Sequence, residues 1–136
     1  MIKRLMLLVT LIFNAGCMST ADDAARLQEL QRAKAGAIDV VLLSSRDALK
    51  QGKDSSILEF RSGSDQGLVD VGTVKVSATM PMAGMSPMIG SANVRPAGVG
   101  RYALETDLSM AGSWRLAVEW DGPAGKGSAS LPGQAQ

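Results

Sequence analysis

Histidine is absent from the 136 residues of this chain, and cysteine occurs only once, at Cys17. The missing imidazole removes a ligand that Cu(II), Zn and Ni sites commonly use, and also the most frequent general base of enzymes. The acidic residues are scattered over expected turns and strand ends without forming an evident pair. We therefore expect a protein without acid–base or nucleophilic catalytic groups, that is, no enzyme.

An excess of charge of either sign is lacking as well. The full chain carries 14 Lys and Arg residues against 13 Asp and Glu residues, and removal of a leader containing Lys3 and Arg4 would leave a nearly neutral protein. No stretch forms the basic stripe that binding to phosphate backbones requires, so we do not expect nucleic acid as a partner. A chain of this length accommodates one small domain beside an export segment.

The chain also lacks an apolar run long enough for a transmembrane helix. Residues 5–13 are apolar apart from one threonine, which falls short of the roughly 20 residues that span a bilayer. This run follows a short basic start and leads to Ala15-Gly16-Cys17, the layout of a secretory signal. The Ala-Gly-Cys ending resembles the lipobox of bacterial lipoproteins, which implies that residues 1–16 are removed and that the cysteine is lipidated.

Lipidation of Cys17 would anchor the protein at a membrane surface in the periplasm. Resemblance to Gram-negative lipoproteins further implies transport to the outer membrane, because Met18 stands where aspartate would favour retention in the inner one. Asn14 stands where the lipobox prefers an aliphatic residue. The alternative is therefore an ordinary cleaved signal with a chance cysteine.

A helical spacer is expected over residues 17–36, behind the lipid anchor. Residues 19–35 are rich in helix formers, with acidic residues near the start and Gly36 at the end. Leu27 and Leu30 are the only large apolar side chains there. The thin apolar stripe favours a solvated spacer over the alternative, a helix that binds a partner.

Beyond Gly36 apolar residues alternate with polar ones and turn residues recur at short intervals, which is typical of an antiparallel sandwich or barrel. We predict about seven strands in a domain of residues 37–136, the size of an immunoglobulin-like β-sandwich. The strands at 100–108 and 113–121 are joined by a tight reversal, and we expect them to pair as a hairpin. The predicted strands are residues 38–44, 56–61, 68–80, 92–96, 100–108, 113–121 and 128–131.

Methionine, in contrast, is abundant between residues 80 and 88, where the sequence is Met-Pro-Met-Ala-Gly-Met-Ser-Pro-Met. Thioether sulfur is neutral and soft, and it prefers Cu(I), and by the same softness Ag(I), to hard cations. Met82, Met85 and Met88 lie where proline and glycine interrupt any regular strand, so strand packing does not account for them. These three are the first candidates for metal ligands.

Met80 and Met110 are further candidate ligands. Met80 ends an alternating strand on its apolar face, where packing is the favoured role. Met110 precedes Trp114, whose indole would add a cation–π contact of about 1 to 2 kcal/mol to a desolvated cation, although packing is favoured for Trp114 too. For the whole cluster, the alternatives to metal binding are an adaptable contact surface and plain packing.

Several pieces of residues 38–131 resemble the YtkA-like family, which includes FixH-like proteins of bacterial envelopes. The more specific pieces are Met-Pro-Met-Ala-Gly-Met after an alternating strand and Met-Ala-Gly-Ser-Trp at 110–114. Gln-Gly-Lys at 51–53, before a strand ending in Phe60, and Gly-Arg-Tyr at 100–102 are generic to β-sandwiches. The resemblance implies an immunoglobulin-like sandwich and a link to copper handling or cytochrome oxidase assembly. Relatives with a histidine in the methionine loop differ from this chain, which argues against a Cu(II) role.

We therefore expect an envelope-anchored periplasmic binding protein that captures Cu(I) or Ag(I) through its methionine loop. Its role would be copper homeostasis, efflux or delivery, because thioether sites without thiolate should exchange their ion readily. The alternative is a non-metal interaction module whose loop docks on an efflux adaptor or another envelope protein, such as an oxidase-assembly protein.

Overall fold

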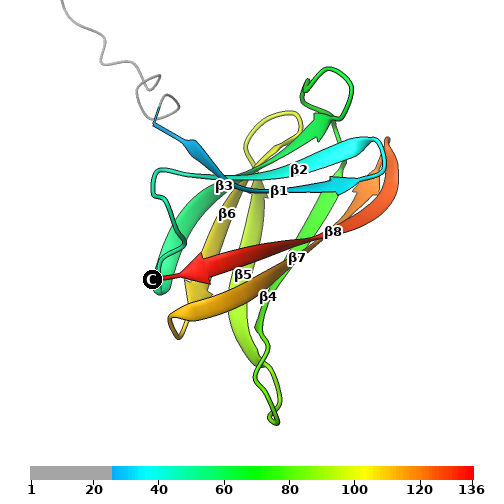
Figure 1. Ribbon diagram of the computed structural model, residues 1–136. Helices are drawn as coiled ribbons and strands as arrows, with labels where there is room; N and C mark the ends of the chain where they lie inside the picture. The colour runs from blue at the N-terminus through cyan, green and yellow to red at the C-terminus, as the bar shows by residue number, and fades with distance from the viewer. Residues whose placement is uncertain (1–25) are drawn as a thin grey trace, which may run out of the picture.

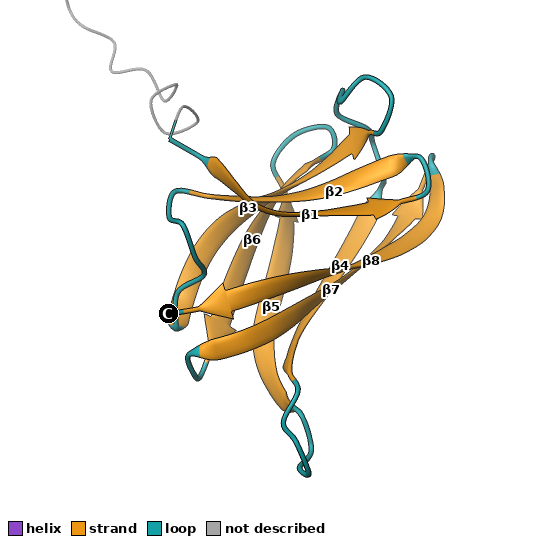
Figure 2. Cartoon of the chain, viewed as in Figure 1, coloured by secondary structure: helices purple, strands orange, loops and turns teal. Residues whose placement is uncertain are grey.

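The computed structural model describes residues 26–136, which form an all-β antiparallel structure of eight strands (Figure 1, Figure 2). The predicted signal, Cys17 and the first part of the predicted spacer lie outside the described residues. Within residues 26–136 no helix is long and apolar enough to cross a membrane. The strands are β1 (Gln28–Ala35), β2 (Ile38–Ser44), β3 (Gly52–Ser62), β4 (Thr73–Met80), β5 (Met88–Pro96), β6 (Arg101–Leu108), β7 (Gly112–Gly122) and β8 (Gly125–Ala135).

The strands form two sheets that share β5. One sheet has the order β1, β2, β3, β6, β5, and the other has the order β5, β4, β7, β8. Residues 91–96 pair with β6 and residues 88–90 pair with β4, so β5 changes sheets at Gly90. A Cβ atom at this corner would lie 3.0 Å from both Leu108 and Trp114, and glycine is the residue that fits.

The hydrophobic core lies between the sheets and is built from alternating residues. On β6 and β7 every second side chain is buried, which confirms the predicted inward faces. The ring of Phe60 meets the rings of Tyr102 and Trp120 edge to face, with centroids 5.4 and 5.3 Å apart. The Tyr102 hydroxyl donates to the carbonyl of Gly72 at 2.6 Å, so this buried polar group has a partner.

One end of the core is closed by Leu49, in the connection between β2 and β3. Its side chain is 2% exposed and would collide with any side chain larger than glycine at Gly133. Its N–H donates to the carbonyl of Gln134 (3.1 Å) and its carbonyl accepts from the N–H of Gln136 (3.0 Å). This connection links the first sheet to β8, so the sandwich is nearly closed into a barrel.

The structure corrects the predicted spacer, because residues 28–35 form strand β1 and not a helix. β1 pairs along its length with β2, and a turn at Gly36 with φ of 62° joins the two strands. Leu30 and Ala33 pack against the core. Sheet pairing together with this burial outweighs the helix propensity of the segment, which is a weak preference per residue.

Side-chain hydrogen bonds and ion pairs connect β1 to the neighbouring elements. Arg32 donates to Glu29 (2.8 Å), Asp39 (2.9 Å) and Gln66 (2.6 Å), and Gln66 in turn donates to Asp39 (3.1 Å). The hydrogen bonds from Gln66 and then Arg32 lower the pKa of Asp39, against the opposing effect of burial. The hydrogen bond from Arg32 likewise lowers the pKa of Glu29.

The predicted hairpin of residues 100–108 and 113–121 is wrong. β6 pairs with β3 and β5, whereas β7 pairs with β4 and β8. Residues 109–111, which we call the crossover, pass from one sheet to the other. The two strands present their apolar faces to the same core from opposite sheets. Strands arranged in this way have the same alternation of apolar and polar residues in their sequence as the strands of a hairpin.

Candidate functional site

The candidate methionines lie at the end of the molecule that holds the β4–β5 connection. Met80 ends β4 and Met88 begins β5, and the two residues are direct partners in the antiparallel ladder. Side chains of such partners project on the same side of the sheet, with Cβ atoms about 4.5 to 5.5 Å apart. Both methionines are half-buried against the core. The ladder therefore places the Cβ atoms of two methionines side by side.

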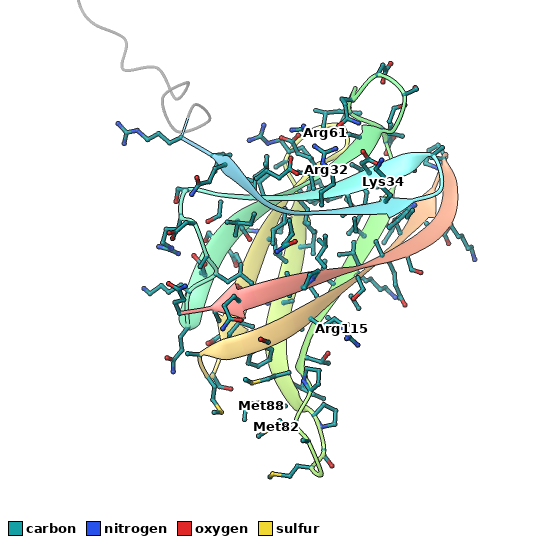
Figure 3. The ribbon with its side chains drawn as sticks, viewed as in Figure 1. Arg32, Lys34, Arg61, Met82, Met88 and Arg115 are labelled. Carbon is teal, nitrogen blue, oxygen red and sulfur yellow. The ribbon has the colours of Figure 1, made fainter. Side chains whose placement is uncertain are left out.

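Residues 81–87 form a loop that projects from this pair. Figure 3 shows the labelled Met82 and Met88 at the lower end of the molecule, where the loop leaves the sheets. The N–H of Met85 donates to the carbonyl of Met82 at 3.3 Å, in a turn in which Gly84 has a φ of 71°. Met82 is half-buried, whereas Met85 is 69% exposed. The side chain of Met82 is therefore partly covered, whereas that of Met85 reaches into solvent.

The crossover lies against the methionine pair. The hydroxyl of Ser109 donates to the sulfur of Met88 at 3.0 Å. Gly112, directly after the crossover, lies beneath the methyl group of Met80, where any larger side chain would collide with it. Met110 lies between these two contacts in the chain and is 41% exposed. The fold thus brings Met110 to the same end as the other four methionines.

Trp114 belongs to the hydrophobic core, where it is 2% exposed. Its indole N–H donates to the carbonyl of Met110 at 2.9 Å, which fixes the backbone of the crossover. These contacts give Trp114 a packing role and a hydrogen-bonding role. The cation–π contact with a bound ion stays a prediction.

The donor set at this end is chemically soft. Over residues 26–136 no three Cys, Asp or Glu side chains gather as ligands for a metal ion, and histidine is absent from the sequence. A hard divalent cation would need several oxygen ligands, whereas thioethers suit Cu(I). The thioethers at this end would suit a soft monovalent ion better than a hard divalent one.

A surface groove of about 700 Å³ lies elsewhere, on β3, β5, β6 and the β2–β3 connection. Its lining mixes charges of both signs, including Lys53 and Asp107. Arg46 in this groove is already ion-paired with the buried carboxylate of Asp54. The groove presents no set of like ligands, so we place the candidate site at the methionine end.

The sequence does not identify Ser109 as a residue of the site. Its neighbour Met110 is the one signal in the sequence, because the contact with Met88 depends on the crossover, where the sequence predicts a hairpin turn. The sequence also predicts Met88 in the loop, whereas the structure shows it as the first residue of β5.

Residues 32–119 match the model of a family described as YtkA-like. The match covers more than half of the chain and extends from β1 to β7, so it includes both the methionine loop and the crossover. A comparison with curated proteins finds no match.

Proposed function

This chain belongs to the YtkA-like family, and from that premise we propose that it is a binding protein that captures Cu(I) or Ag(I) through thioether sulfur. The observation that carries the proposal is the register of β4 and β5, which makes Met80 and Met88 cross-strand partners at the root of a methionine-containing loop. Thioethers stay neutral at all physiological pH values, and they match the softness of these ions.

The five methionines differ in their proposed contributions. Met80, Met82 and Met88 are the half-buried members of the cluster and supply the main ligands. Met110 supplies a further ligand from the crossover, and the exposed Met85 gives the arriving ion its first contact. The set contains neither thiolate nor imidazole. Such a site favours exchange, which suits delivery to an efflux system or to oxidase assembly in copper homeostasis.

We place the protein in the periplasm, lipid-anchored through Cys17 at the outer membrane. This part of the proposal is supported by the Ala-Gly-Cys motif that follows the apolar leader. Replacing Cys17 with serine should remove a fatty acid label from the protein and release it from the membrane fraction after export. A fatty acid label that persists in the Cys17→Ser variant would contradict the anchor.

Anaerobic titration of the full chain in detergent with Cu(I), against a competing chromophoric chelator, tests the metal site. Met80, Met82 and Met88, the proposed main ligands, changed together to leucine should abolish saturable binding, because leucine preserves volume but has no lone pair. Among single variants, Met88→Leu should weaken binding by about tenfold or more, equivalent to about 1.4 kcal/mol. Met85→Leu is the matched control with the smaller loss. Binding that survives the triple change would contradict the proposal.

The alternative is a non-metal module that docks its loop on another envelope protein. It is favoured by the exposure of Met85 (69%) in the loop and of Ile89 (75%) in β5, since exposed apolar side chains suit a contact surface. This function predicts capture of an envelope protein by the metal-free chain. Loss of that capture in Met85→Ser, without any Cu(I) binding by the wild type, would favour it over the metal site.

A further inference from the structure

Three hydrogen bonds hold the crossover in place. The side-chain amide of Gln51 donates to the carbonyl of Ser109 at 3.1 Å, and the indole of Trp114 donates to the carbonyl of Met110 at 2.9 Å. The third bond runs from the hydroxyl of Ser109 to the sulfur of Met88 at 3.0 Å. Only this third bond ends on the sulfur of a proposed metal ligand, because the second ends on the backbone carbonyl of Met110. The first two keep the Ser109 hydroxyl within reach of that sulfur.

Metal binding and this hydrogen bond compete for the same electron density. A thioether binds Cu(I) by donating a sulfur lone pair, and the same sulfur is a weak hydrogen-bond acceptor. Once its density is shared with a cation, the sulfur of Met88 becomes a poorer acceptor for Ser109. Ser109 is exposed, so its hydroxyl can turn to water when it leaves the sulfur.

We infer that Ser109 is a positioning residue that latches Met88 in its metal-free position and thereby weakens ion binding. Ion binding weakens the hydrogen bond from Ser109 to Met88, and loss of this bond lowers the net affinity for the ion. The other two bonds keep the backbone of the crossover in place. The latch rests on the proposed thioether site. Its consequence is a site that is easier to empty than its ligands alone would make it.

The variant Ser109→Ala tests the latch, and Ser113→Ala is its matched control. The Ser113 hydroxyl donates to the side chain of Gln134 at 2.9 Å, is equally exposed, and touches no methionine sulfur through a hydrogen bond. Anaerobic Cu(I) titration of the full chain should show Ser109→Ala binding about threefold to tenfold more tightly than wild type, the range of one net hydrogen bond. Ser113→Ala should bind as the wild type does.

A second measurement needs no metal. In the metal-free protein with ¹³C-labelled methionine methyl groups, the methyl resonance of Met88 should shift in Ser109→Ala and should not shift in Ser113→Ala, because the sulfur loses its hydrogen-bond partner only in the first variant.

The metal titration of the wild type and the two variants is repeated with Ag(I), which serves as a redox-inert probe of the same site.

The outcomes separate the latch from the metal site. Tighter binding by Ser109→Ala together with a shifted Met88 methyl supports the latch. Wild-type binding with equal or weaker binding by Ser109→Ala overturns the latch and leaves the proposed function intact. An unmoved Met88 methyl in metal-free Ser109→Ala shows that the contact is absent and overturns the latch as well. A wild-type chain that binds neither Cu(I) nor Ag(I) overturns the proposed function, and the latch with it.

Discussion

Gly72 combines a positive φ with a close backbone approach. Its φ is 76°, and a Cβ atom there would lie 2.6 Å from the carbonyl oxygen of Asp121. Gly84, in the methionine loop, has a nearly equal φ of 71° but no atom within 4 Å of the Cβ position. Alanine variants at the two positions therefore separate the energetic cost of backbone strain from the cost of steric collision.

Gly84→Ala should lower the free energy of unfolding by about 1 to 2 kcal/mol, the cost of a left-handed backbone for an L-residue. Gly72→Ala should cost clearly more, about 3 kcal/mol or above, because the strands must also move apart. Urea unfolding followed by tryptophan fluorescence measures both. Equal losses for the two variants would show that the close approach at Gly72 relaxes freely.

Charged groups stabilise the packing of strand β1, so we expect the stability of this element to fall at acid pH. The pKa values of Asp39 and Glu29 lie below their ordinary values of 3.8 and 4.5, so folding favours the ionised carboxylates. The resulting stabilisation is complete above the ordinary pKa values and is lost as the pH falls through the lowered ones. Arg32→Gln removes the main cation, so its urea midpoint should fall less steeply than that of wild type between about pH 5 and pH 3.

The control for Arg32→Gln is Arg95→Gln. Arg95 pairs with Glu105 at 2.5 Å, but both side chains are largely exposed, 71% and 51%. An exposed ion pair of this kind contributes little to the free energy of unfolding, so the urea midpoint of Arg95→Gln should depend on pH as that of the wild type does.

Hydrogen exchange is a second measurement on Arg32→Gln. At neutral pH the backbone amides of β1 should exchange faster in this variant than in the wild type. Identical pH profiles for wild type and Arg32→Gln would contradict the role of this cluster.

Alternation along single strands was enough to predict most strands and their inward faces. A continuous apolar run predicts β2 with its observed bounds, 38–44, and alternation predicts the buried faces of β6 and β7. It failed for β1, because helix formers predominate there and the stabilising partners, Asp39 and Gln66, come later in the chain. Alternation also gave the wrong pairing for the strands on either side of the crossover. The pattern within one strand does not indicate which sheet the next strand joins.

The candidate site was predicted from the same local information, with the same limit. A dense run of methionines suggested a cluster and named its members, but the pairing of Met80 with Met88 follows from the register of two strands. The contact of Ser109 with Met88 follows from the path of the crossover. Both are properties of the tertiary fold.

The whole molecule is held closed by Leu49, which joins the first sheet to β8. Leu49→Ala should lower the free energy of unfolding by about 2 to 5 kcal/mol, because it leaves a cavity between Gly133 and the core. Leu68→Ala is the matched control at a side chain that is 46% exposed, and its effect should stay within about 1 kcal/mol. Urea denaturation compares them. Similar losses for the two variants would contradict the closing role of Leu49.

The hairpin of β4 and β5 ends at the pair Met80 and Met88, and residues 81–87 extend beyond the last rung of the ladder. The open space around Gly84 shows that the tip makes no close contact there with the rest of the sandwich. The domain can thus be treated as a scaffold that displays an exchangeable peptide. Loop sequences of other lengths and compositions can be grafted between Met80 and Met88 and compared on one constant framework.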